Sequence, residues 1–313
     1  MSGAAALAAG AALPARAQTA PTPMKIGTAG QQGNAGVYYA QDMGYFKRVG
    51  LDASITTLTK GSGAAVVAAV TGGTLDCGEA DIVAFAAAHS HGIKISLLAP
   101  SAFWTDAAPT QGIVVAKTSP VRGVRDFAGK TIGVPSLEGI SRISTNAWLE
   151  AGGVDLTSVK FVEAPSSSAA LAVVRGTIDA YVMTEPTLSA ALTDCRIIAA
   201  PLNAVGKQFI ETAYFGSDDW IARNPQQAVK FALAMRDAQR WANANHAQAA
   251  VIYEKYSGAT AESMKNSVPT RFGDVLVASL IQPVLDVAYK YHTLAQPIAA
   301  KDLISPAVLS VGR

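Results

Sequence analysis

The chain has 313 residues, of which 50% are apolar and 15% charged, and its formal net charge at pH 7 is +2. That length is enough for two α/β domains. The small net charge gives no electrostatic footprint for nucleic acid or for an anionic membrane surface. We therefore expect a well-buried globular protein without a nucleic-acid partner.

The first 17 residues differ in character from the rest. Residues 4–13 are an apolar run of small side chains without a charge, and Ala15 and Ala17 form an A-x-A site just before polar Gln18. This pattern is typical of a secretory signal, although no basic residue precedes the run. The run is too short to span a bilayer. We predict a signal peptide at residues 1–17 and a periplasmic location.

The two cysteines, Cys77 and Cys195, lie more than a hundred residues apart. Export permits a disulfide, but such a distant pair does not make a framework, so we expect two buried, unpaired thiols. His89 and His91 would fall on different faces of a helix. No Cys or His pair has the spacing of a metal site, and we expect neither a metal nor a cofactor.

Strand and helix signals alternate along the first hundred residues. Asn34 can cap a helix that runs to about residue 46, and Gly61, Ser62 and Gly63 open another. Such alternation predicts a parallel sheet with helices on both faces. The predicted strands are 24–28, 51–58, 75–78 and 93–98, and the predicted helices are 34–46, 63–70 and 81–91.

The alternation begins again near residue 111, and the chain then returns to its first part. Asn224 followed by Pro225 marks a long helix to about residue 245, and the last helix contains Pro283 as a kink. The predicted strands are 112–116, 131–134, 159–162, 178–183 and 212–215, with helices between them and at 251–256 and 274–291. We predict an α/β protein whose lobe 1 comprises 24–110 and 205–313 and whose lobe 2 comprises 111–204.

Six short segments carry a family resemblance through their order and spacing. They are GYF at 44–46, GLD at 50–52, GGTLD at 72–76, VRDFAGKTIGV at 124–134, LEAGG at 149–153, and GTIDA at 176–180 ahead of Glu185-Pro186. The chain resembles the substrate-binding proteins of ABC importers for sulfonates, nitrate, taurine and thiamine-precursor pyrimidines. The resemblance covers most of the mature chain. It implies a type II periplasmic binding protein, with two doubly wound lobes, a two-segment hinge and a ligand between the lobes.

Ligands of open α/β sheets bind beyond the carboxyl ends of the strands, and the resemblance points to the same loops. Several of these loops lead into helix N-termini, which favour anions. Asn34, Ser62 and Ser141 are short donors there, but helix capping explains them equally well. The selected loops are 30–34, 60–62, 80–81 and 101–104 in lobe 1, and 135–141, 163–166 and 184–185 in lobe 2.

The other candidate side chains point to different ligand charges. Phe103 and Trp104, in a predicted rim loop, would stack on a planar ligand or pack between the lobes. Glu138 and Glu185 suit cationic or N–H groups, whereas Arg142 suits a carboxylate or sulfonate, or pairs with Glu138. The candidate ligand-binding residues are Gln31, Gln32, Asn34, Tyr38, Gly61, Ser62, Asp81, Phe103, Trp104, Ser136, Glu138, Ser141, Arg142 and Glu185.

The sequence therefore predicts a monomeric solute-binding protein of an ABC importer, with a small-molecule solute and a membrane permease as its partners. A sulfonate, a nitrate-like anion, a carboxylate and a pyrimidine all stay open as ligands. The alternatives are a non-transport receptor and an enzyme of the pyrimidine synthase type on the same fold. That enzyme branch carries a Cys-rich motif, which this sequence lacks, and no histidine falls in a predicted cleft loop. We therefore expect no catalytic activity.

Overall fold

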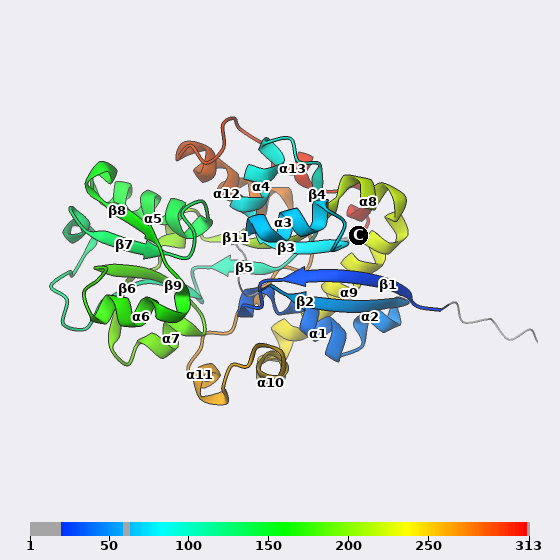
Figure 1. Cartoon of the computed structure of the whole chain (residues 1–313), viewed down its shortest axis with the longest axis horizontal. Coiled ribbons are helices and arrows are strands. Elements are labelled where there is room, and N and C mark those ends of the chain that lie inside the picture. The colour runs from blue at the N-terminus through cyan, green and yellow to red at the C-terminus, as the bar shows by residue number, and fades with distance from the viewer. Residues whose placement is uncertain (1–19, 59–62, 312–313) are drawn as a thin grey trace, which may run out of the picture.

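The computed structural model describes residues 20–58 and 63–311, which form two lobes joined by a narrow sheet (Figure 1). The predicted signal peptide, Gly61 and Ser62 lie outside the described residues. No helix of the described part is long and apolar enough to cross a membrane.

Lobe 1 is built on a five-stranded sheet in the order β2-β1-β3-β12-β4. The strand β1 is parallel to β2 and β3, whereas β12 is antiparallel to both of its neighbours. The four strands of the first hundred residues therefore run parallel to one another, as predicted, and β12 lies antiparallel between β3 and β4 because the chain re-enters this sheet from the opposite end after crossing lobe 2. The strands are β1 (Thr22–Thr28), β2 (Leu51–Thr57), β3 (Cys77–Asp81), β4 (Ile95–Pro100) and β12 (Thr212–Ser217).

Lobe 2 holds a second five-stranded sheet, in the order β10-β6-β9-β7-β8. β6 is buried along its whole length, as expected for a strand with neighbours on both sides and cover on both faces. It runs antiparallel to β9 and β10, while β7 is parallel to β8 and β9. β10 was not predicted from the sequence. The strands are β6 (Gln111–Ala116), β7 (Thr131–Val134), β8 (Lys160–Glu163), β9 (Ala180–Thr184) and β10 (Cys195–Ala199).

A short antiparallel sheet joins the lobes and forms the hinge. The chain leaves lobe 1 through β5 (Ala102–Thr105) and returns through β11 (Gln208–Ile210), and β13 (Arg271–Phe272) pairs with the other edge of β5. Trp104 of β5 is fully buried and stacks on Phe209 of β11 with ring centroids 6.3 Å apart. The strands of this sheet are part of neither five-stranded sheet. The predicted lobe boundaries at residues 111 and 204 therefore stay a prediction.

Helices cover both sheets, and the C-terminal helices pack mainly on lobe 1. In lobe 2 they are α5 (Ile140–Ala151), α6 (Ser166–Val174) and α7 (Thr187–Ala191). In lobe 1 they are α1 (Gly36–Asp42), α2 (Tyr45–Arg48), α3 (Gly63–Thr71), α4 (Ile82–Ser90), α8 (Asp218–Arg223), α9 (Pro225–Ala244), α10 (His246–Ser257), α11 (Ala261–Lys265), α12 (Ala278–Lys290) and α13 (Ala300–Leu303). Short 3-10 turns are η1 (Gln32–Asn34), η2 (Val124–Phe127), η3 (Leu156–Ser158), η4 (Pro201–Ala204) and η5 (Pro306–Val308).

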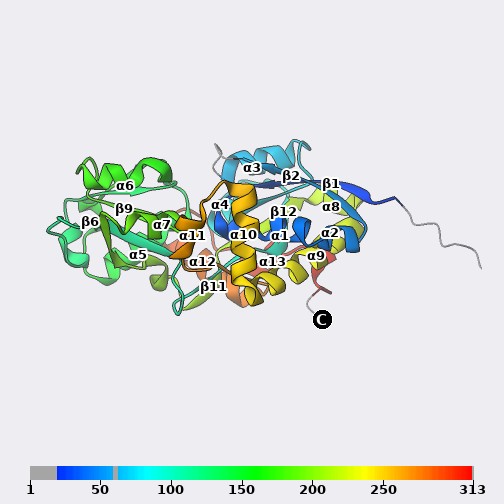
Figure 2. The ribbon, with the colours of Figure 1, turned by 90° about the horizontal axis from the view of Figure 1, so that it is seen from below.

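Two helices connect the lobes beyond the hinge. α5 of lobe 2 packs against α12 and α4, and its Ile140 and Ile143 belong to the apolar core of lobe 1. On the side seen in Figure 2, α11 lies between α10 and lobe 2 and contacts α7. The two lobes therefore share buried surface as well as chain crossings.

One predicted helix and two predicted helix caps differ from the structure. Gly44, with φ +73°, divides the predicted helix at 34–46, so that η1, α1 and α2 follow one another. Asn34 therefore lies inside η1 and caps no helix. Ser141 does not cap α5 either, because the N-cap is Gly139.

Both cysteines are buried and unpaired, as predicted. Cys77 lies on β3 of lobe 1 and Cys195 lies on β10 of lobe 2. The two thiols therefore belong to different sheets, and the fold gives them no role in joining the lobes.

Candidate functional site

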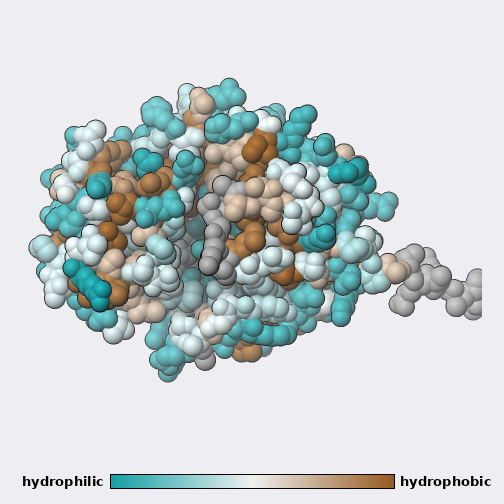
Figure 3. Space-filling view, viewed as in Figure 1, coloured by the Kyte–Doolittle hydropathy of each residue, from teal (hydrophilic) through white to brown (hydrophobic). Residues whose placement is uncertain are grey.

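A cavity of about 1100 Å³ lies between the lobes and is lined by both of them. Figure 3 shows the surface hollowed between the two lobes. The lining follows the carboxyl ends of β1 and β3 in lobe 1 and of β7 and β9 in lobe 2. This is the position at which open α/β sheets bind ligands.

The turn after β1 forms one edge of the cavity. Gly30, with φ +74°, lets the chain turn sharply there. Asn34 Oδ1 accepts a 3.2 Å hydrogen bond from the Gln31 amide, and the Tyr214 hydroxyl donates to the Asn34 carbonyl at 2.8 Å. Tyr253 of α10 donates to the Gly30 carbonyl at 3.2 Å. Buried tyrosines therefore hold this turn in place from two other elements.

Three carboxyl groups lie together on the lobe 1 wall. Glu79 and Asp81 are two residues apart on β3, and Glu211 precedes β12, whose Thr212 pairs with Asp81. Asp81 Oδ1 caps α4 by accepting 3.0 Å bonds from the amides of Val83 and Ala84. Its Oδ2 faces lobe 2, because a Cβ atom placed on Gly139 of lobe 2 would lie 3.7 Å from this oxygen. This set brings three acidic side chains to one wall.

Burial sets the protonation of these three groups. It raises the pKa of Glu79 to about 8, against hydrogen bonds from Thr212 and Asn34 that lower it. It raises the pKa of Asp81 to about 6, against the two capping amides. Burial and the neighbouring charge of Asp81 raise the pKa of Glu211 to about 7. Desolvation and mutual repulsion both disfavour three carboxylates so close together.

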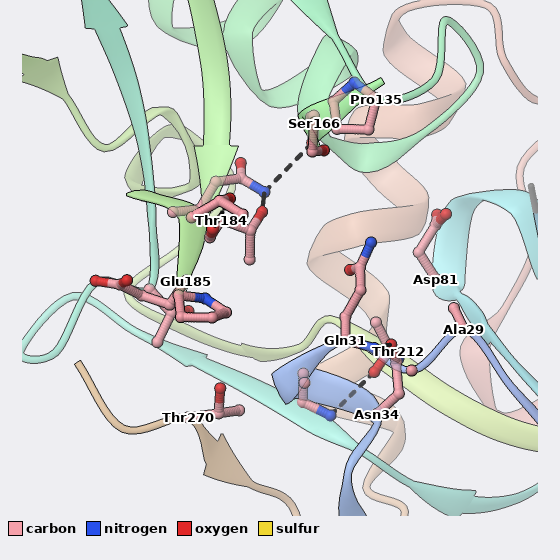
Figure 4. Close-up of a pocket in the computed structure, with 18 of the residues that line it drawn as sticks. Ala29, Gln31, Asn34, Asp81, Pro135, Ser166, Thr184, Glu185, Thr212 and Thr270 are labelled. Carbon is pink, nitrogen blue, oxygen red and sulfur yellow. Dashed lines mark hydrogen bonds between the residues drawn. The ribbon is translucent and has the colours of Figure 1, made fainter. Parts of the chain in front are cut away.

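Besides Glu163 and Glu185, the lobe 2 wall presents neutral hydrogen-bonding groups. The Gln111 side chain on β6 lies 3.3 Å from Ser141 Oγ and 3.5 Å from Thr184 Oγ1. Tyr181 on β9 donates to the Ala164 carbonyl at 2.9 Å and lies 3.2 Å from Ser166 Oγ. Figure 4 shows Ser166 and Thr184 opposite Asp81, Asn34 and Thr212. Lobe 2 therefore offers hydroxyl and amide groups to a ligand.

Glu185 of lobe 2 is engaged by its own neighbours. Its Oε1 accepts bonds from Ser189 Oγ at 2.8 Å and from the Val268 amide at 3.3 Å, and its Oε2 accepts from the Ser189 amide at 3.1 Å. Ser189 Oγ also lies 2.9 Å from the Asn266 carbonyl. Glu185 is buried and lines the cavity, but its oxygens fasten the segment after α11 to lobe 2.

The structure brings six of the predicted site residues to the cavity and places six others elsewhere. Lining it are Gln31, Asn34, Asp81, Ser136, Ser141 and Glu185. The lining does not include Gln32, Tyr38, Phe103, Trp104, Glu138 or Arg142. Gly61 and Ser62 lie outside the described residues.

Five of the six residues away from the cavity have identifiable structural contacts, and Glu138 is exposed. The predicted rim loop at Phe103 and Trp104 is wrong, because these residues form β5 of the hinge. Tyr38 stacks on Tyr256 with ring centroids 4.6 Å apart. Arg142 lies over Phe161 and donates to the Leu137 carbonyl at 3.0 Å, on another face of α5.

The remaining two residues of this group are polar. Glu138 is exposed. Gln32 Oε1 accepts a 3.1 Å bond from Thr270, a residue that does line the cavity.

Sequence reasoning missed Glu79, Gln111, Glu211 and Tyr253. Glu79 could have been found from its place inside the buried strand CGEAD. Burying an ionisable group costs free energy unless the group has a partner, so such a residue often has a function. Gln111 opens a strand that is otherwise apolar, which is a similar signal. Neither Glu211 nor Tyr253 stood out, since their position depends on the return of the chain to lobe 1.

The groups that line the cavity do not form a metal centre in the described part of the chain, where no cluster of three or more His, Cys, Asp or Glu has suitable geometry.

The two lobes, the hinge and the position of the cavity define the class of protein: the fold is that of a type II periplasmic binding protein. A model of the NMT1/THI5 like family matches residues 31–249, and the chain belongs to this family. No curated protein sequence matches the chain.

Solved structures with this fold match nearly the whole chain. The periplasmic aliphatic sulphonate binding protein SsuA from Escherichia coli is 19% identical, with a TM-score of 0.73 over 91% of this chain and 98% of its own. The periplasmic nitrate-binding protein NrtA from Synechocystis PCC 6803 is 14% identical, with a TM-score of 0.75 over 94% and 88%. A DszB mutant in complex with biphenyl-2-sulfinic acid is 14% identical, with a TM-score of 0.64 over 91% and 96%.

Proposed function

We propose that this protein is an exported solute-binding protein that captures a small organic molecule between its lobes and presents it to the permease of an ABC importer. The cavity between the lobes carries this proposal, because hydrogen-bonding groups from both sheets line it. A solute that contacts both walls binds the closed form better than the open form, and so it shifts the population toward closure.

The placement of the nucleophilic and basic residues supports binding instead of catalysis. Neither of the two cysteines and none of the four histidines lines the cavity. Among the described residues, the lining therefore has no Cys–His or Ser–His pair of the kind that activates a nucleophile. The SsuA and NrtA structures, which share the fold, are titled as periplasmic binding proteins, and this supports the periplasmic location expected from the N-terminal sequence.

The test begins with native mass spectrometry of freshly purified protein, to identify a retained solute. Solution scattering with and without that solute should show a smaller radius of gyration in the bound form. Adding the solute back should also raise the melting temperature. A protein that retains no solute, and whose melting temperature no compound of a broad metabolite panel raises, would contradict the proposal.

A further inference from the structure

Within the part of the chain that the structure describes, the charged residues that line the cavity all have acidic side chains. The charged residues among the described lining are Glu79, Asp81, Glu163, Glu185 and Glu211, and all of them are acidic. Glu185 is engaged by Ser189 and Val268, and the exposed Glu163 accepts a 3.1 Å bond from the Leu137 amide. The three carboxyls of lobe 1, which we call the carboxyl triad (Glu79, Asp81 and Glu211), are the groups left to meet a ligand.

One buried oxygen of the triad has no hydrogen-bond partner in the described structure. Glu79 is only 3% exposed and lines the cavity, and its Oε1 has no hydrogen-bond partner in the described structure. An ionised carboxylate oxygen can only accept hydrogen bonds, so its natural partner is an N–H or O–H group. A buried acceptor left without such a partner is costly.

The facing wall offers a complement. Gln111 of lobe 2 is 2% exposed and also lines the cavity, and its Oε1 has no partner. Its amide can present either end to the cavity, because the hydroxyls of Ser141 and Thr184 both donate and accept. A ligand with several N–H groups can therefore be bound from both walls at once.

An anion fits this arrangement poorly. The N-terminus of α5 would favour one, but Asp81 Oδ2 already faces Gly139 at that terminus. An anion placed there would lie beside three desolvated carboxyls and would disfavour the ionisation of each of them further. A cation instead relieves their mutual repulsion and allows charge-assisted hydrogen bonds.

We propose, building on the solute-binding role above, that the solute is a small organic cation with N–H donors, such as an amine, amidine or guanidine, held by the carboxyl triad and closed over by Gln111, Ser141 and Thr184. The triad supplies the charge and lobe 2 supplies neutral hydrogen bonds.

The raised pKa values of the triad give this proposal a pH signature. A permanently charged guanidine binds the ionised triad best, so its affinity rises as the pH increases from 5 toward 8 and binding releases protons. The other titratable or hydrogen-bonding groups around Glu79 come from three places. They are Asp81 on the same strand, Asn34 on η1, and Glu211, Thr212 and Tyr214 at and just before β12. None of these groups is basic.

The experiment compares matched probes by melting temperature and calorimetry. Agmatine, benzamidine and putrescine are cations with N–H donors, choline is a cation without them, and methanesulfonate and nitrate are anions. We expect at least one N–H cation to bind, choline to bind more weakly, and the anions not to bind. If methanesulfonate or nitrate binds and no cation does, the inference fails while the solute-binding role stands. If nothing binds and native mass spectrometry finds no retained solute, the solute-binding role fails too.

Variants then assign the binding to the triad. Glu79→Gln and Glu211→Gln keep the shape and remove a charge, and each should weaken binding of the cation by about 10- to 100-fold. Glu138→Gln is the matched control, because Glu138 is exposed and lies outside the cavity lining; its affinity should not change. Circular dichroism confirms that each variant folds. Equal affinity in all three variants overturns the assignment.

A last variant changes Lys60, which lies outside the described residues. Lys60→Gln should leave cation binding intact, and loss of cation binding in this variant would overturn the inference.

Discussion

The cleft wall of lobe 1 presents Glu79, Asp81 and Glu211, whereas the wall of lobe 2 presents Gln111, Ser141 and Thr184. The supporting structure is similar on both sides. A buried tyrosine on a strand holds a cleft turn by its carbonyl in each lobe, Tyr214 at Asn34 and Tyr181 at Ala164. The two walls therefore share a way of positioning their turns. They differ in which polar groups are left for a ligand, since Glu163 and Glu185 of lobe 2 are bonded to neighbouring groups. Lobe 1 is suited to select the charge of a solute, and lobe 2 to close over its shape.

The largest expected effect tests whether the two walls depend on one hinge. Trp104 is fully buried in β5, so Trp104→Ala should lower the free energy of unfolding by about 3–5 kcal/mol. Because α5 of lobe 2 packs into the core of lobe 1, we expect one cooperative transition in urea, followed by circular dichroism. Trp104→Phe, which keeps a ring against Phe209, should cost much less. Two separate transitions would mean that the lobes are independent.

The next effect concerns the charge of lobe 1 in the ligand-free protein. The folded state keeps Glu79 protonated up to about pH 8, whereas the unfolded chain releases this proton near pH 4.5. The unfolded state thus binds fewer protons in this window, so stability falls as the pH rises from about 5 to 8. Asp81 and Glu211 act in the same direction, up to about pH 6 and 7.

Melting temperatures measured across this pH range check the prediction. Glu79→Gln should flatten the decline, and Glu138→Gln should follow the unmodified protein. A melting temperature that increases between pH 5 and 8, or a Glu79→Gln variant with an unchanged slope, would contradict the assignment of the decline to Glu79.

A smaller effect tests the similarity of the two supports. Tyr214→Phe and Tyr181→Phe each remove one hydroxyl and should each cost about 0.5–1.5 kcal/mol in urea unfolding. In Tyr214→Phe, the Asn34 carbonyl still accepts a longer 3.4 Å hydrogen bond from the Thr28 hydroxyl. The loss of stability in Tyr214→Phe should therefore not exceed the loss in Tyr181→Phe by more than about 1 kcal/mol, the width of this range. A loss confined to one of the two variants would show that the supports are not equivalent.

The smallest effect lies at the outer edge, where Lys290 of α12 pairs with Glu150 of α5. Both side chains are about half exposed, and solvent screens such pairs strongly. Lys290→Ala should therefore leave the unfolding midpoint unchanged within experimental error, as should Lys301→Ala on the exposed surface of lobe 1. A clear loss of stability in Lys290→Ala alone would make this contact part of what holds the lobes together.

The alternation of strands and helices could be predicted from the sequence because each element carries its own local pattern. The antiparallel course of β12 could not, since it depends on how far the chain has travelled before it returns. The same distinction applies to the site. Asp81 ends β3 and Asn34 follows β1, and both were predicted, but Glu211 meets Asp81 only through the pairing of β12 with β3.

The aromatic pair Phe103 and Trp104 shows the opposite error. Adjacent aromatic residues after a strand suggested a ligand-stacking loop, yet tertiary packing uses them as hinge strand β5. Arg142 was assigned to the cleft by its place in the chain alone. A helix turns by about 100° per residue, so Ser141 faces the cavity while its neighbour faces Phe161.

The segment at 266–270 is tied at both ends to different parts of the molecule. Its start is bonded to Glu185 and Ser189 of lobe 2, and its end to Gln32 of lobe 1 through Thr270. Five residues span at most roughly 17 Å when fully extended. While both ends stay bonded, the length of this segment limits how far the two lobes can separate on this side of the cleft. Wider opening of the cleft requires that the hydrogen bond from the Val268 amide to Glu185 breaks, so this bond would limit the opening.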